Sequence, residues 1–215
     1  MGAIALAHNG NLINANRLRN ELELDGAIFQ TSSDSEVILN LLAKRARLGL
    51  QQAISDTCNT IRGAFALVML IGNKLIAVRD PLGIRPLCLG KIRGSEIHVL
   101  ASESCALDIV GADLIRSIEP GEMLIIDETG LNSYRYAKNT HRASCSFEYI
   151  YFSRPDSILD GLDVYHVRES AGRCLFHQKP VEADVVIGVP DSGVVAAIGY
   201  SEESKIPYSM GLVRS

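Results

Sequence analysis

The chain has 215 residues, and its 21 basic and 25 acidic side chains give a formal net charge of −4 at pH 7. This balance argues against nucleic acid as the main partner, because neutralising phosphates requires a clustered basic excess. Apolar residues make up 47% and charged residues 21% of the sequence, which is the composition of a globular protein and excludes a disordered one.

The first part of the chain combines one predicted strand with three predicted helices. The apolar run at residues 4–7 predicts a buried strand, and Asn9-Gly10-Asn11 after it predicts a turn. Helices are expected at residues 14–24, from the capping-box sequence Ser33-Asp34-Ser35-Glu36 up to Leu48, and at residues 51–61.

Between residues 63 and 136 the pattern changes to short apolar runs separated by Gly, Pro or Asp. Such runs predict antiparallel strands in a meander, with one helical interruption at residues 103–110. The expected strands are residues 64–71, 74–78, 87–91, 97–101, 114–118, 123–126 and 131–136.

A polar and basic stretch at residues 138–144 is expected to link two domains. After it, the sequence predicts a helix over residues 164–178, a strand over 183–189 and a helix over 194–203. A strand, a short polar loop and a helix in this order open an α/β unit. We therefore expect an α+β domain over residues 1–144, and over residues 145–215 the start of an α/β domain whose parallel sheet is not completed.

The chain carries no sign of secretion or membrane insertion. Its longest apolar run is far shorter than the roughly 20 residues needed to cross a bilayer, and its start lacks the basic region of a signal peptide. The five cysteines are widely spread and form no C-x-x-C pair, which favours free thiols in a reducing cytosol. We expect a cytoplasmic protein without a membrane partner.

Two polar segments in the first half carry groups suited to acyl transfer. The Asn9 side-chain amide and the Gly10 backbone N–H could converge as an oxyanion hole, although a tight turn explains the same residues. The Asp34 carboxylate could hold an ammonium group of a substrate, or it could stabilise a helix start. Taken one at a time, these residues favour the structural explanation.

The loop Val189-Pro190-Asp191-Ser192-Gly193 leaves a predicted strand and enters a predicted helix. Backbone N–H groups at such a helix start suit phosphate or pyrophosphate, and the Ser192 hydroxyl could ligate magnesium bound to that anion. The glycine-rich pattern of a P-loop is absent. The loop of residues 79–87, in contrast, is expected to anchor the fold through internal ion pairs.

Five motifs occur in one order along the whole chain. They are His-Asn-Gly-Asn-Leu (8–12), Thr-Ser-Ser-Asp-Ser-Glu (31–36), Gly-Ala-Phe-Ala (63–66), Arg-Asp-Pro-Leu-Gly-Ile-Arg-Pro-Leu (79–87) and Phe-Glu-Tyr-Ile-Tyr-Phe-Ser-Arg-Pro-Asp-Ser (147–157). This combination resembles the glutamine phosphoribosylpyrophosphate amidotransferases, also called amidophosphoribosyltransferases. The first four motifs are shared in looser form with other class II glutamine amidotransferases, whereas the fifth and residues 184–214 point to this family.

The resemblance implies a partial Ntn-hydrolase αββα sandwich over residues 1–144, followed by the start of a type I phosphoribosyltransferase domain over residues 145–215. It also implies an activity in purine synthesis, in which ammonia from glutamine displaces pyrophosphate from phosphoribosylpyrophosphate to give phosphoribosylamine. The complete form is expected to be a homo-oligomer.

Site residues follow by the same resemblance. Asn9 and Gly10 fall on the oxyanion-hole positions, and Asp34 falls on the carboxylate that holds the α-amino group of glutamine. Ser192 falls on a magnesium position. Cys145 falls on a candidate ligand position for a [4Fe–4S] cluster, with a buried structural thiol as the alternative.

The chain departs from the family pattern at both ends. The family's nucleophile is an N-terminal cysteine, which is expected upstream, whereas this sequence begins Met1-Gly2. The remaining cluster cysteines are expected beyond Ser215. The sequence therefore resembles an internal fragment that is expected to be inactive by itself. A non-catalytic Ntn-like binding module and a hexosamine-forming amidotransferase are the alternatives.

Overall fold

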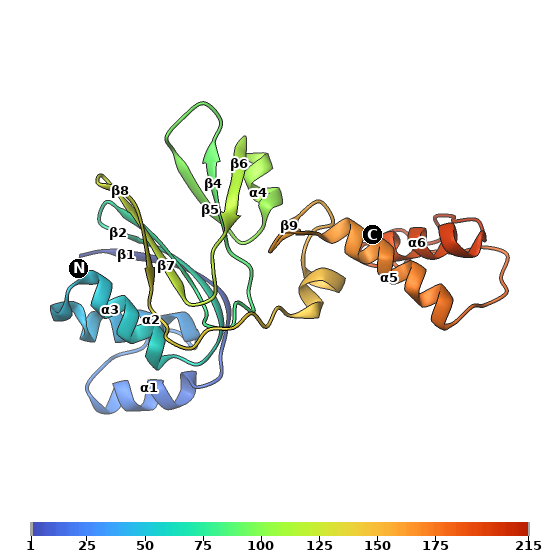
Figure 1. The fold of residues 1–215 in the computed structure, drawn as a ribbon. Helices are drawn as coiled ribbons and strands as arrows, with labels where there is room; N and C mark the ends of the chain where they lie inside the picture. Colours follow the sequence, from blue (N-terminus) through green and yellow to red (C-terminus); the bar gives the residue numbers. More distant parts are fainter. Residues whose placement is uncertain (1, 215) are drawn as a thin grey trace. The chain divides into compact units, whose positions relative to one another are not determined.

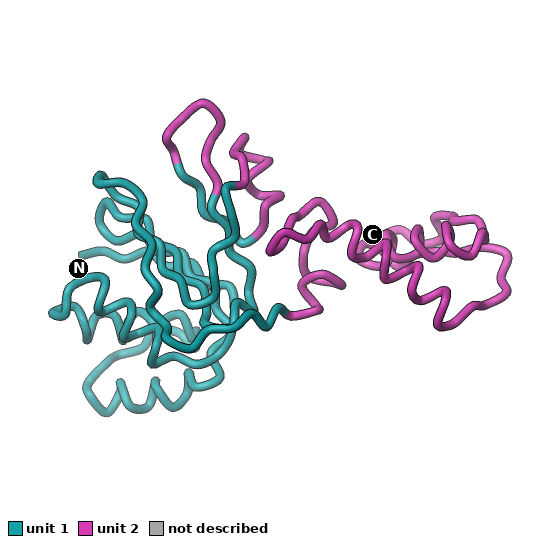
Figure 2. Tube along the Cα trace, viewed as in Figure 1, with its two compact units in different colours: residues 1–89, 98–102, 115–144 teal, residues 90–97, 103–114, 145–215 magenta. Residues whose placement is uncertain are grey.

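The structure is a computed structural model, and it describes residues 2–214. The contacts between residues divide the chain into two compact units (Figure 2). The first unit contains the residues up to Leu89, residues 98–102 and residues 115–144; the second contains residues 90–97, residues 103–114 and the residues from Cys145 onward. The assignment of residues 1–144 and 145–215 to two functional domains stays a prediction.

A five-stranded sheet forms the centre of the first unit. Its strands are β1 (Ile4–Leu12), β2 (Gly63–Ile71), β3 (Lys74–Arg79), β7 (Glu122–Asp127) and β8 (Gly130–Arg135), and they lie in the order β1-β2-β3-β7-β8. All four neighbouring pairs are antiparallel. In this order β1 is an edge strand of the sheet as far as residues 2–214 form it.

The turn expected at Asn9-Gly10-Asn11 is wrong, because β1 continues through these residues and pairs Gly10 with Phe65 of β2. Gly10 has a φ of 150°, and a Cβ atom placed on it would lie 2.0 Å from the carbonyl oxygen of Ala64. Only glycine allows this close approach of two backbones, so the Asn-Gly sequence supports strand pairing here and not a turn.

The predicted strands after residue 79 do not form one meander. A second sheet of three strands contains β4 (Cys88–Ile92), β5 (His98–Ala101) and β6 (Ala112–Ser117) in the order β5-β4-β6. The helix α4 (Ser104–Ile109) lies between the last two strands along the chain. The chain leaves the large sheet after β3 and returns to it at β7, which pairs with β3.

Three helices cover one face of the large sheet in Figure 1: α1 (Ala15–Leu24), α2 (Asp34–Lys44) and α3 (Leu50–Thr60), with a 3-10 turn η1 (Ala46–Leu48) between the last two. Phe65, Leu67 and Met69 of β2 point into the core beneath these helices, whereas Ala66 of β2 belongs to a second apolar cluster. This alternation is the two-residue period of a strand that is buried on both faces. No helix among residues 2–214 combines the length and the apolarity needed to cross a membrane.

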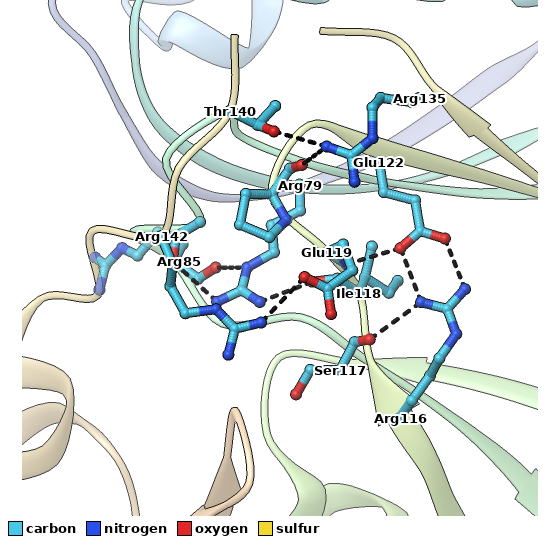
Figure 3. A network of polar contacts seen from close by, with 12 residues as sticks. Arg79, Arg85, Arg116, Ser117, Ile118, Glu119, Glu122, Arg135, Thr140 and Arg142 are labelled. Atoms are coloured by element: carbon cyan, nitrogen blue, oxygen red, sulfur yellow. Dashed lines mark hydrogen bonds and ion pairs between the residues drawn. The ribbon is translucent and has the colours of Figure 1, made fainter. Parts of the chain in front are cut away.

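The loop after β3 is anchored by Arg79, which is fully buried. Figure 3 shows its polar contacts. The Arg79 guanidinium donates hydrogen bonds to the carbonyl oxygens of Arg85, Gly83 and Ile118, at 2.8, 2.9 and 2.7 Å. The neighbouring Asp80 carboxylate accepts backbone N–H groups, among them that of Leu82 at 2.9 Å. The charged residues therefore anchor this loop as expected, through contacts to backbone groups, and the expected internal ion pairs stay a prediction.

In the second unit, a π-helical segment η2 (Glu148–Phe152) and the short strands β9 (Ile158–Leu159) and β10 (Leu162–Asp163) precede two helices, α5 (Val164–Gln178) and α6 (Val194–Ser204). The strand expected over residues 183–189 is wrong. Only an isolated parallel bridge joins Val186 to Tyr208, and Val185, Ile187 and Val189 are exposed. A strand needs a partner along its length, and within the described residues this segment pairs only around Val186.

The helices α5 and α6 pack closely through two glycines. A Cβ atom on Gly172 would lie 1.9 Å from the carbonyl oxygen of Ala196, and one on Gly199 would lie 2.0 Å from that of Glu169. Each glycine therefore lets the backbone of one helix contact the other directly.

Candidate active site

The backbone of Gly10 offers a hydrogen-bond donor at the outer edge of β1. Both backbone polar groups of Phe65, its partner in the register, are bonded to Asp80 on the other side of β2. The Gly10–Phe65 pair is therefore a non-hydrogen-bonded pair, and the Gly10 N–H points away from β2. Leu12 lies two residues further on and has the same orientation. Its N–H donates to the Asp34 carboxylate at 3.0 Å, which places that carboxylate at the same edge.

Asp34 is the first residue of α2, and its side chain is 23% exposed. The helix start is the predicted one, because Ser33 is the N-cap and its hydroxyl accepts the Ser35 N–H at 3.2 Å. The capping box is not reciprocal, since Glu36 instead accepts the N–H groups of Gln30 and Thr31, each at 2.8 Å. These backbone hydrogen bonds, that of Gln30 first, lower the pKa of Glu36.

A pocket of about 400 Å³ opens where the end of β1 meets the start of α2. Residues 10–13, 15, 16 and 32–34 line it, so the predicted residues Gly10 and Asp34 border the same pocket. A carboxylate held by one backbone N–H and open to a pocket can bind an ammonium group through its remaining lone pairs. A neighbouring backbone N–H can bind an oxyanion.

Asn9 lies between these groups in sequence, but its side chain is on the opposite face of β1 from that of His8. Its Nδ2 donates to the Ser102 hydroxyl at 3.4 Å, and the residue is half-buried. The Asn9 amide and the Gly10 N–H are thus adjacent donors on one strand, and their common role as an oxyanion hole stays a prediction.

Three further residues at the site, His8, Ser35 and Ser102, are not among those predicted from the sequence. His8 Nδ1 lies 3.2 Å from the Ser35 hydroxyl and 3.4 Å from the Asp34 carboxylate, and the His8 side chain is 3% exposed. His8 lies in the motif of residues 8–12 and Ser35 in that of residues 31–36, so these motifs are the sequence signal by which both could have been found. Ser102 is 93 residues from Asn9, and no pattern in the sequence connects them.

A second pocket of about 720 Å³ lies within the second unit. Asp191 and Ser192 line it together with Arg154, Arg168 and Arg214, so the pocket combines cationic side chains with oxygen donors. Arg214 Nη1 is 3.3 Å from Asp191 Oδ2. The peptide bond between Pro190 and Asp191 is cis.

Arg168 is the buried arginine of this pocket, at 4% exposure. It donates to the carbonyl oxygens of Tyr149 and Ser153, at 2.6 and 2.7 Å. Burial lowers the pKa of Arg168, and the charge of Glu103 opposes this shift. Arg168 therefore holds the polypeptide around η2 in place beside the pocket.

The loop before α6 uses part of its own donors. The N–H of Gly193 donates to Val189 at 3.0 Å, and that of Val194 donates to Asp191 at 3.4 Å. The Asp191 carboxylate, which also contacts Arg214, and the Ser192 hydroxyl supply oxygen atoms to the pocket, and oxygen is the ligand that Mg²⁺ prefers. The donor set fits the predicted magnesium position.

The residues around Cys145 do not assemble a cluster site. Cys145 is half-buried, while Cys58, Cys88 and Cys105 are buried and Cys174 is exposed. Nowhere among residues 2–214 do three or more His, Cys, Asp or Glu side chains gather in a way that could hold a metal ion. The other cluster cysteines are expected beyond Ser215, so the [4Fe–4S] role of Cys145 stays a prediction.

Comparison with known proteins shows the family and the fold of the chain. The family described as "Glutamine amidotransferase domain" matches residues 1–108. The amidophosphoribosyltransferase of Bacillus subtilis is 48% identical over 214 residues, covering all of this chain and 44% of that protein. Two solved structures each have a TM-score of 0.94 and 48% identity and cover 99% of this chain: the glutamine phosphoribosylpyrophosphate amidotransferase of B. subtilis with ADP and GMP, and "the allosteric regulatory enzyme of purine biosynthesis". The chain covers 46% and 45% of these two.

The chain belongs to the glutamine amidotransferase domain family, and its fold is the α+β fold of the B. subtilis amidotransferase structure. It spans less than half the length of the curated relative described above.

Proposed function

We propose that this chain supplies the glutamine-binding part of an amidophosphoribosyltransferase. In that reaction, ammonia released from glutamine displaces pyrophosphate from phosphoribosylpyrophosphate and gives phosphoribosylamine, a step of purine synthesis. The observation that carries the proposal is the Asp34 carboxylate, fixed by the Leu12 N–H at the edge of β1 and open to the same pocket as Gly10. The cytoplasmic location and the homo-oligomeric state expected from the sequence belong to this proposal.

In this proposal Asp34 binds the α-ammonium group of glutamine, and this contact is the same in the ground state and the transition state. The Gly10 N–H and the Asn9 amide act instead on the oxygen that becomes negative when the amide carbon is attacked. By the family resemblance, the nucleophile is an N-terminal cysteine. No cysteine is among the residues that line the pocket of about 400 Å³.

The pocket in the second unit is proposed to hold phosphoribosylpyrophosphate. Arg154, Arg168 and Arg214 bring positive charge to it, which suits a ligand with several phosphate groups. Ser192 and Asp191 are the residues that would hold magnesium, and the ion when bound supplies further neutralisation of the pyrophosphate charge. The names of the relatives do not favour the hexosamine-forming or the purely binding alternative.

Glutamine binding tests the central claim. Isothermal titration of the protein with L-glutamine is compared with the Asp34→Asn variant, which keeps an acceptor for the Leu12 N–H but loses the charge. We expect a loss of about 10- to 150-fold in affinity, the value of one hydrogen bond to a charged group. Asp113→Ala, in an exposed ion pair with Arg93, is the control and should not change the affinity. Unchanged binding in Asp34→Asn would contradict the proposal.

A further inference from the structure

His8 presents a buried polar side chain that the proposed reaction does not use. It lies on β1, on the face that packs against α2, and 3% of its side chain is exposed. Its Nδ1 has two oxygen neighbours, Ser35 Oγ at 3.2 Å and Asp34 Oδ1 at 3.4 Å. Its Nε2 is fully buried, and no hydrogen-bond partner for it exists among residues 2–214.

These neighbours determine where the imidazole carries its proton. A carboxylate only accepts hydrogen bonds, and the Ser35 hydroxyl can accept or donate, so a proton on Nδ1 suits both of its oxygen neighbours. A second proton on Nε2 would bury a charged N–H group without an acceptor, which is costly. The neutral ring with its proton on Nδ1 is therefore the form that fits the site.

The charges around the ring agree with a neutral state. Burial lowers the pKa of His8, the Asp34 carboxylate opposes this shift, and the positive charge of Arg85 adds to the lowering. The imidazole beside Asp34 consequently adds no positive charge at this position.

We propose that His8 is a positioning residue for the substrate's ammonium group: its Nδ1–H and the Leu12 N–H hold the Asp34 carboxylate from two sides, so that the carboxylate faces the pocket at the edge of β1. The two contacts use different oxygens, since Leu12 bonds to Oδ2 and His8 faces Oδ1. The inference rests on the proposed binding of glutamine by Asp34 and adds the residue that orients this group.

The test uses two ligands that differ only at the group in question. L-Glutamine carries the α-ammonium group, and 4-carbamoylbutanoate is the same molecule without it. His8→Leu removes the donor, whereas His8→Asn places an amide N–H near the position of Nδ1. We expect His8→Leu to weaken glutamine binding about tenfold, the effect of one lost hydrogen bond to a charged group. Binding of 4-carbamoylbutanoate should not change, and His8→Asn should restore most of the affinity for glutamine.

Equal losses for both ligands in His8→Leu would overturn the inference, because they would show a general structural role. So would a failure of His8→Asn to restore binding in a protein that folds normally. If the unmodified protein does not prefer glutamine over 4-carbamoylbutanoate, the proposed role of Asp34 fails first, which separates the two claims.

The protonation state can be tested without any ligand. ¹⁵N NMR of the imidazole distinguishes the two neutral tautomers, and we expect His8 to carry its proton on Nδ1 at pH 7. In Asp34→Asn the fixed acceptor is lost, and we expect this tautomer to lose its preference. A proton on Nε2, or a charged ring at pH 7, would contradict the inference.

Discussion

The two candidate pockets are built in different ways. In the first unit the groups that face the pocket are placed by strand register: Gly10 and Leu12 lie on one edge of β1, and Leu12 bonds directly to Asp34. In the second unit the pocket is lined by loops, by a short π-helical segment and by Arg168 of α5. Arg168 holds this lining through bonds to two carbonyl oxygens.

This difference predicts different responses to substitution. A residue that fixes strand register affects the whole sheet, because each strand pair supports the next. A residue that fixes a loop wall affects local opening, since loops and helix ends unfold at lower free energy than a central sheet. We therefore expect large global effects at the edge of β1 and smaller, local effects around Arg168.

The largest effect is expected for Gly10→Ala. The new Cβ would lie 2.0 Å from the Ala64 carbonyl oxygen, so β1 and β2 would have to separate. We expect a loss of about 3 kcal/mol or more in the free energy of unfolding, measured by urea denaturation.

Gly72→Ala is the matched control. Its φ of 59° is also positive, but no atom lies within 4 Å of the added Cβ, so only about 1 kcal/mol should be lost. Equal losses in both variants would show that the close approach at Gly10 is unimportant.

The next effect concerns catalysis by Asn9. In a form of the protein that turns over glutamine, Asn9→Ala should reduce kcat by roughly 10²–10³-fold, the cost of one lost oxyanion donor. The value of KM should change little, because the donor acts on charge that develops in the transition state. Ser102→Ala removes the same Asn9–Ser102 hydrogen bond but keeps the donor, and kcat should stay within a few fold. A change in KM alone would contradict the role of Asn9.

The sequence predicted much of the fold because its signals are local. β2 and β3 were found from their apolar runs, and α5 was found from its helical period. The course of β1 through Asn9 and Gly10 was missed, since it depends on the pairing of Gly10 with Phe65, which lies far along the chain. The strand over residues 183–189 was expected from its β-branched composition, but composition does not supply a pairing partner.

The candidate site was predictable only where a motif contains the residue. Asp34 and Gly10 lie in such motifs and are predicted site residues, and the structure brings them to one pocket. The contact between His8 and Ser35 spans 27 residues and that between Asn9 and Ser102 spans 93. Such contacts depend on how the helices and strands pack. The chemical type of each residue does not predict them.

A moderate and local effect is expected for Arg168→Met. Methionine fills part of the buried volume but leaves the carbonyl oxygens of Tyr149 and Ser153 without their donor. We expect a local loss of about 2 kcal/mol, since each of the two carbonyl groups that lose the arginine costs at least about 1 kcal/mol. Hydrogen exchange of residues 148–157 should become faster, while exchange in β2 and β3 should not change. Arg154→Met, which breaks only an exposed pair with Asp156, should have little effect. Faster exchange throughout β2 and β3 in Arg168→Met would show that the second pocket is not a local structure.

The smallest effect is expected at the β7–β8 hairpin, where a polar contact lies beside the sheet but does not determine its register. Lys74 bonds to Asp127 and, with hydrogen bonds from Thr129, lowers the pKa of Asp127 to about 2. A carboxyl group with a lowered pKa in the folded state stabilises the protein above its unfolded pKa, and this contribution is lost as the pH falls toward 2. Lys74→Met should therefore raise the pKa of Asp127 and flatten the fall in stability between about pH 4 and pH 2. Carboxyl ¹³C NMR titration measures the pKa of Asp127, and urea denaturation at several pH values measures the change in stability. Lys138→Met is the control for removing one positive charge. If Lys138→Met raised the pKa of Asp127 as much as Lys74→Met does, net charge and not the Lys74 contact would be its cause.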